Sequence, residues 1–268
     1  MTTDPPPPRR KWHFNRWLIV FIVAVFGWSG WRAYAFRSAL SQAKALGWDV
    51  DYTDPVETIR KNWKAAFKKE TWLDGVTYVR NPTSEAFDQH LAIVHRLNPK
   101  ALQIDNAFTL RDLSALSPLT RLQKVWLRDC TGLTNLDALK NLSVLQVVYL
   151  KGCTGLTNLD PLKNLSALVV VKLPGCTGLT NVDALTNLSA LQDVRLDGCT
   201  GLTNVDALKN LSALQEVALG GCTGLTNVDA LKNLSALQEV DLTGCTGLTK
   251  ESVAALKASL PNAEIIGP

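Results

Sequence analysis

The stretch LQDVRLDGCTGLTNVDALKNLSA, residues 191–213, is one unit of a repeat, because close copies of it precede and follow it in the chain. A cysteine marks the same place in each copy, and successive cysteines stand 23 residues apart. A fixed period with matching flanks predicts a solenoid, in which each unit buries its apolar side chains only against its neighbours. The ladder consists of Cys130, Cys153, Cys176, Cys199, Cys222 and Cys245.

Each unit has an extended half and a tightly turning half. Val194 and Leu196 are two residues apart, which places them on one side of a strand and Arg195 on the other. The later apolar residues recur every third position, a spacing that suits 3₁₀-like turns. Asp206 and its equivalents are predicted to cap these turns, and Gly201 and its equivalents to form the corner after the strand.

The pattern L-x-x-V-x-L-x-x-C-x-x-L resembles that of leucine-rich repeat proteins with short bacterial-type repeats. The resemblance covers residues 99–268 and is carried by Leu122, Val125, Leu127, Cys130 and Leu133, and again by Leu237, Val240, Leu242, Cys245 and Leu248. It implies an α/β solenoid with a parallel β-sheet on its concave face. It also implies a binding role without catalysis. A degenerate unit around Ala107 adds a strand to the six units that contain cysteine, which makes about seven.

The chain is predicted to have five segments. The solenoid is preceded by an N-terminal transmembrane helix and a small α+β neck, which contains a strand at 76–80 and a capping helix at 84–97. The segments are a basic, proline-rich tail (1–16), the transmembrane helix (17–36), the neck with the N-terminal cap (37–98), the solenoid (99–249) and a C-terminal helical cap (250–268).

The segment 17–36 is predicted to be a single-pass signal anchor in contact with membrane lipid. Its first fifteen residues are uncharged, and tryptophans flank it at both edges. A cleaved signal peptide is an alternative, because Ala33-Tyr34-Ala35 resembles a cleavage site, and a buried helix of a soluble domain is another. A small excess of Lys and Arg before the segment predicts that the repeats lie on the periplasmic or extracellular side. An intracellular adaptor would require the opposite topology.

The cysteine ladder has three interpretations. The thiols can act as small buried hydrophobes that fill one position in every rung. Disulfides are a second possibility, although stacked rungs about 4.8 Å apart fit disulfide geometry poorly. Metal binding is the third, but the chain has no Cys-x-x-Cys pair, and its histidines, His13, His90 and His95, lie outside the repeats with cysteine. No metal site and no cofactor is predicted.

Neither catalysis nor nucleic-acid binding is predicted. The sequence contains no phosphate-binding loop, dinucleotide fingerprint, nucleophile elbow or His-Glu-x-x-His motif. Residues 1–100 hold 15 Lys and Arg against 9 Asp and Glu, whereas the remainder holds 13 against 15. The repeats are therefore slightly acidic, unlike a basic nucleic-acid platform.

The positions between the core residues of each strand are predicted to face outward and to carry most of the variation between repeats. They are aromatic and basic in the N-terminal half and acidic in the C-terminal half. Exposed Trp and Tyr flanked by Arg are typical of interface anchors, which predicts a protein- or glycan-binding patch of Trp126, Tyr149, Arg128, Lys151, Lys172 and Arg195. Two alternatives stay open: aromatic stacking that only stabilises the strands, and a passive surface-spacer role for the whole protein.

Overall fold

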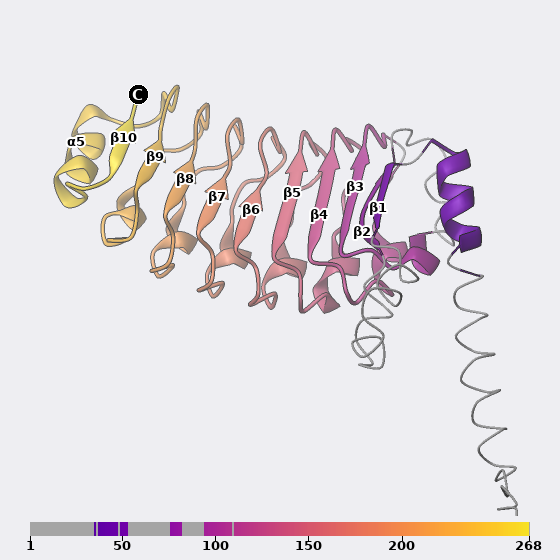
Figure 1. Ribbon diagram of the computed structural model, residues 1–268. Helices are drawn as coiled ribbons and strands as arrows, with labels where there is room; N and C mark the ends of the chain where they lie inside the picture. The colour runs from indigo at the N-terminus through magenta and orange to yellow at the C-terminus, as the bar shows by residue number, and fades with distance from the viewer. Residues whose placement is uncertain are drawn as a thin grey trace, which may run out of the picture.

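The computed structural model describes residues 35–52 (except 36 and 48), 76–81 and 94–267 (except 109). Its strands form one ten-stranded sheet in sequence order from β1 to β10 (Figure 1). Each 23-residue step along the chain moves the strand one place along this sheet, as the repeat predicts. The strands of the repeats are β3 (Ala101–Asp105), β4 (Lys124–Arg128), β5 (Val147–Lys151), β6 (Val170–Lys172), β7 (Asp193–Arg195), β8 (Glu216–Ala218) and β9 (Glu239–Asp241).

The register of the sheet repeats the register of the sequence. Trp126 pairs with Tyr149, which pairs with Lys172, and Lys172 pairs in turn with Arg195, always between parallel strands. Equivalent side chains of successive units therefore form straight columns across the sheet. Within a column, neighbouring residues are about 4.8 Å apart, which is the usual separation of paired strands.

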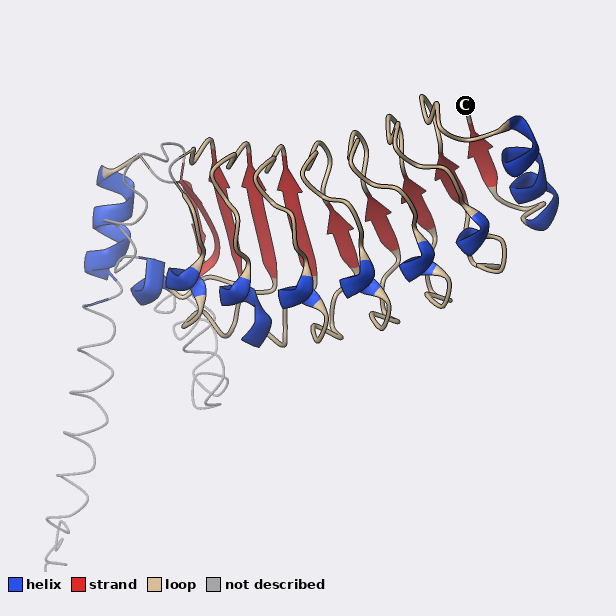
Figure 2. Cartoon of the chain, turned by 180° about the vertical axis from the view of Figure 1, so that it is seen from behind, coloured by secondary structure: helices blue, strands red, loops and turns tan. Residues whose placement is uncertain are grey.

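A short 3₁₀ turn follows each strand from β3 to β8 on the other side of the coil, where the turns form a row (Figure 2). The three-residue spacing of the apolar side chains suits 3₁₀ geometry, because residues i and i+3 lie above one another in such a helix. The turns are η2 (Ser114–Leu116), η3 (Asp137–Asn141), η4 (Asp160–Leu162), η5 (Asp183–Leu185), η6 (Asp206–Leu208) and η7 (Asp229–Leu231).

The core is a continuous stack of aliphatic side chains between the sheet and the turns. Val194, Leu196, Cys199 and Leu202 of one unit are all fully buried, and their equivalents in the other units are at most 8% exposed. Ala107 fills the cysteine position of the degenerate unit and is equally buried. Stacking thus hides the apolar surface that a single unit leaves open.

The aspartates at the start of the 3₁₀ turns do not cap them, which corrects the prediction made for Asp206 and its equivalents. The Oδ1 atom of Asn204 accepts a hydrogen bond from the backbone amide of Asp206 at 3.1 Å, and Asn158 does the same for Asp160 at 2.7 Å. Each asparagine makes an Asx turn two residues ahead of its own position. The capping function therefore lies on the Asn of the Thr-Asn pair.

The role predicted for Gly201 and its equivalents also needs correction. The left-handed backbone lies at the residue before each cysteine, which is Asp129 at φ +54° before Cys130 and a glycine in the later units, such as Gly198 at φ +69°. Gly201 is needed for a different reason, since a Cβ there would lie 2.8 Å from the carbonyl oxygen of Leu179. In the units from Cys153 onward, one glycine makes the corner and the other allows close contact with the preceding rung.

Further elements continue the sheet at both ends. β1 (Asp49–Tyr52) pairs antiparallel with β2 (Val76–Asn81), and β2 pairs in parallel with β3. The strands of the predicted neck are therefore part of the solenoid sheet. At the other end, α5 (Lys250–Ser259) is capped by the Thr249 hydroxyl and is followed by β10 (Glu264–Ile266).

Two predicted segments fall largely outside the described residues. Of the predicted transmembrane helix at 17–36 only Ala35 is described, and of the predicted capping helix at 84–97 only residues 94–97, which are helical. In the part of the chain that the structure does describe, no helix has the length and apolar character that a membrane span requires.

Candidate functional site

The open face of the sheet carries the side chains that lie between the core positions of the strands. Along β4 to β9 these are half-buried, and they include Trp126, Tyr149, Lys172, Arg195, Ala218 and Asp241. Over β4 to β7 this open face is hollowed into a depression of about 600 Å³. Five of the six predicted patch residues line it, together with valines, a proline and an aspartate: Trp126, Tyr149, Lys151, Lys172, Arg195, Val147, Val170, Pro174 and Asp197.

Arg128, the sixth predicted patch residue, lies at the edge of this depression. Its guanidinium carbon is 5.7 Å from the centre of the Tyr149 ring, within the range of a cation–π contact. Its Nε atom lies 3.9 Å from Oδ1 of Asp105. Arg128 therefore supports the orientation of Tyr149 from the neighbouring rung.

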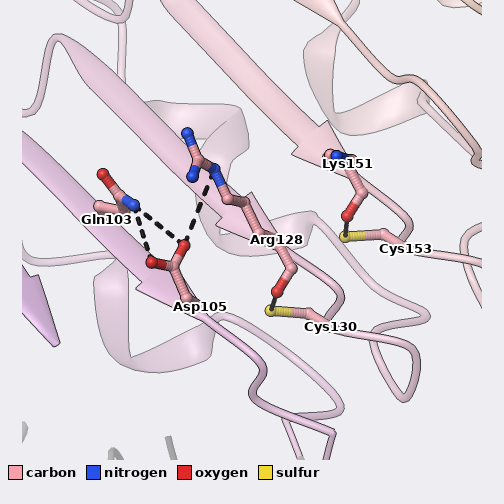
Figure 3. A network of polar contacts seen from close by, with 6 residues as sticks. All are labelled: Gln103, Asp105, Arg128, Cys130, Lys151 and Cys153. Carbon is pink, nitrogen blue, oxygen red and sulfur yellow. Dashed lines mark hydrogen bonds and ion pairs between the residues drawn. The ribbon is translucent and has the colours of Figure 1, made fainter. Parts of the chain in front are cut away.

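At β3 the open face carries a buried polar cluster of Gln103 and Asp105, which are in register with Trp126 and Arg128 but are not accessible. Both residues are only 8% exposed. The Nε2 atom of Gln103 donates to both carboxylate oxygens of Asp105, at 3.0 and 2.8 Å, and Arg128 reaches the same carboxylate from the next strand (Figure 3). Among the strands β3 to β9, the accessible positions of this face therefore begin at β4.

The middle of the open face carries an ion-pair chain that crosses three rungs. Lys172 Nζ lies 2.6 Å from Oδ2 of Asp193, and the guanidinium of Arg195 contacts both Asp193 at 3.2 Å and Glu216 at 2.8 Å. Burial alone would lower the pKa of Arg195, but the two carboxylates raise it above its ordinary value. The basic charges of Lys172 and Arg195 are thus neutralised within the protein.

Two carboxylates converge over Gly220 on the C-terminal side of this chain. A Cβ at Gly220 would lie 3.2 Å from Oδ1 of Asp197 and 3.4 Å from Oδ2 of Asp241, so the two oxygens face the same small space. Desolvation raises the pKa of Asp197, and the charge of Asp241 raises it further. We name this arrangement the Gly220 niche.

The six cysteines are unpaired and buried. The thiols of Cys176, Cys199, Cys222 and Cys245 donate to leucine carbonyl oxygens of the preceding rung at 2.9 to 3.2 Å. In the described ranges, no group of three or more His, Cys, Asp and Glu side chains is arranged to hold a metal ion. The thiols fill the core and satisfy backbone acceptors.

Sequence reasoning placed the patch residues in columns but did not show how they pair. The signal for the ion-pair chain was present, since one column carries the basic residues Lys172 and Arg195 and a neighbouring column carries the acidic residues Asp193 and Glu216. The signal for the Gly220 niche was a glycine in a column that otherwise carries side chains. Neither the convergence of Asp197 and Asp241 nor the burial of Gln103 follows from the sequence pattern.

No family model and no curated protein matches the chain. Among solved structures, internalin C2 from Listeria monocytogenes is similar with a TM-score of 0.55 and 22% identity, over 74% of this chain and 83% of that one. The leucine-rich repeat domain of the type III effector XopL gives a TM-score of 0.53 and 18% identity, over 88% of this chain and 89% of that domain. With its parallel strands and 3₁₀ turns, the chain has the fold of leucine-rich repeat proteins.

Proposed function

We propose that the protein is a non-catalytic binding module that holds a protein partner against the open face of its sheet. The observation that carries this proposal is the depression over β4 to β7, in which Trp126 and Tyr149 stand half-buried beside Lys151. Large aromatic side chains that keep part of their surface in solvent are the usual anchors of protein interfaces. Solenoids of this kind present such extended faces for recognition.

A protein partner fits this surface better than a neutral glycan does. Val147, Val170 and Pro174 make part of the lining apolar, whereas Lys151 and Asp197 place charges of opposite sign at its two sides. A partner that brings both apolar and charged groups can use all of these contacts, and proteins offer that combination. The hydroxyls of an uncharged sugar could form hydrogen bonds with these groups but would bring no charge opposite to Lys151 or Asp197.

The test is capture of partners from a cell-envelope extract by the full-length chain. We expect the double substitution Trp126→Ala and Tyr149→Ala to weaken capture by tenfold or more, because loss of two anchors costs about 2 kcal/mol or more at an interface. Phe108→Ala with Val144→Ala is the matched control, because these side chains are 60% and 40% exposed and do not line the depression. Circular dichroism confirms that both variants are folded.

The outcome separates the binding module from a passive spacer. A partner that is lost with the first double variant and kept with the control supports the binding module. A protein that captures nothing specifically, or that loses its partner equally in both variants, would instead be a surface spacer or would bind through another face.

We also propose that the module is tethered to a membrane through residues 17–36, with the repeats on the periplasmic or extracellular side. The support is the apolar run in the sequence between basic residues and tryptophans. Alkaline phosphatase fused after residue 268 should be active in intact bacterial cells, because it requires the oxidising side of the membrane. A fluorescent reporter that folds in the cytoplasm should be dark at the same position; the reverse pattern would indicate an intracellular adaptor.

A carbonate wash distinguishes an anchor from a cleaved signal peptide. The full-length chain should stay with the membrane fraction, whereas a chain that starts at residue 37 should be released. Release of the full-length chain together with a shorter mature product would show cleavage near Ala35 and would refute the tether.

A further inference from the structure

We infer that the partner segment bound by the open face is extended and bipolar, with a carboxylate that lies over Lys151 and a cationic side chain that enters the Gly220 niche. This inference rests on the proposed function, because it names the chemistry of the partner at the same face. It goes further by fixing two charges, their order along the solenoid and the distance between them.

The N-terminal side of the face offers a cation, Lys151, that pairs with no carboxylate among the residues that the structure describes. Lys151 is exposed and lines the depression, and no ion pair occupies it among the described residues. Tyr149 and Val147 of the same strand line the depression as well. A partner carboxylate could pair with Lys151, and the apolar side chain that follows it could pack on Tyr149 and Val147.

The C-terminal side of the face carries an excess of negative charge, from Asp197 and Asp241. Asp197 and Asp241 point into the niche that Gly220 leaves open. Partial desolvation and mutual repulsion raise the pKa of Asp197, although Arg195 acts in the opposite direction. The exposed Glu239 adds a further negative charge on β9. An ammonium or guanidinium group in the niche would relieve this repulsion.

The ion-pair chain between the two ends favours neither a positive nor a negative charge in the bound partner. Asp193 and Glu216 already balance Lys172 and Arg195. A partner that carried a charge at this point would have to displace an existing pair, which costs about what it gains. The middle of the bound segment is therefore expected to be uncharged, with the discrimination left to the two ends.

The distance between the ends sets the spacing in the partner. Lys151 belongs to the rung of β5 and Gly220 to that of β8, three rungs further along the sheet. At roughly 4.8 Å per rung, the ends are about 14 Å apart. An extended chain advances about 3.3 Å per residue, so the carboxylate and the cation are expected four or five residues apart.

A randomised peptide-display library, selected on the immobilised full-length protein in low salt, tests this inference directly. The enriched peptides should carry Asp or Glu and Lys or Arg four or five positions apart, with apolar or neutral residues between them. Low salt is used because partly exposed ion pairs are screened at high ionic strength. Selection that enriches no peptides, or peptides without this spacing, overturns the inference.

A double-mutant cycle then assigns each charge to its end of the face. The substitutions Asp197→Asn and Asp241→Asn keep side-chain shape, and binding of a selected peptide should fall roughly five- to tenfold. Changing the peptide's cation to glutamine should give the same loss in the native protein and no further loss in this variant. Lys151→Gln should show the equivalent coupling with the peptide's carboxylate. Full additivity at both ends would refute the assignment.

The matched control is Asp137→Asn with Asp160→Asn, which makes the same chemical change at the 3₁₀ turns and should leave peptide binding unchanged. A second copy of this chain is the competing occupant. If sedimentation shows self-association that disappears in the Asp197 and Asp241 variant, the segment inference is overturned in favour of a dimer. Partner capture through Trp126 and Tyr149 is measured in a separate experiment. Failure of the segment inference can therefore be distinguished from failure of the proposed function.

Discussion

Replacing Gly178 with alanine is expected to lower the free energy of unfolding by about 1–3 kcal/mol, the cost of forcing extra atoms into a well-packed interior. A Cβ at this position would lie 2.7 Å from the carbonyl oxygen of Thr154 and 2.8 Å from that of Leu156. Both oxygens belong to the backbone of the preceding rung, so no flexible side chain can move aside. Relief requires the two rungs to separate, and this separation would expose stacked leucines.

Urea denaturation of the variant, followed by circular dichroism, measures this loss. Gly220→Ala is the matched control, because its Cβ would meet only side-chain oxygens within 3.4 Å and its backbone is not left-handed. The control should change the free energy of unfolding by less than about 0.5 kcal/mol, as ordinary surface substitutions do. Equal losses in the two variants would show that close contact between rungs at Gly178 is not what the glycine provides.

The second large effect is a steep loss of stability in alkali. Burial raises the pKa of Cys176 and Cys222 to about 12 and that of Cys199 to about 11, and it also raises the pKa of Cys245. In the unfolded chain a thiol titrates near pH 8.5. Above that pH the unfolded state releases protons that the folded state keeps, so stability falls as pH rises.

The steepness of this loss follows from linkage. Each thiol that stays protonated in the folded state costs about 1.4 kcal/mol of stability per pH unit, between its unfolded pKa and its folded pKa. Below about pH 8 both states keep their protons, so the protein has the full contribution there.

Thiolate absorbance near 240 nm, recorded with circular dichroism through an alkaline titration, checks this prediction. The two signals should change together, because the thiols ionise as the solenoid unfolds. Cys199→Ala with Cys222→Ala should reduce the slope of unfolding free energy against pH by about 2.7 kcal/mol per unit. Thiolate formation near pH 8.5 while the sheet signal persists would contradict the buried, protonated ladder.

The repeat, its register and the identity of its core residues could all be predicted from the amino-acid sequence. A strict 23-residue period, with Val194 and Leu196 two apart and later residues three apart, allows little except a strand followed by a 3₁₀ turn. It also placed Trp126, Tyr149 and the basic residues in columns. These inferences succeed because a solenoid's contacts join equivalent positions of adjacent units.

The contacts between neighbouring rungs could not be predicted in this way and are seen only in the folded chain. The capping by Asn204 in place of Asp206, the contact that requires Gly201, the burial of Gln103 and the Gly220 niche all depend on side-chain direction and on the distance between rungs. The continuation of the sheet into β1 and β2 could not be predicted either, because those strands lack the repeat pattern. Periodicity fixes which residues become neighbours, whereas hydrogen bonding and close packing set which atoms touch.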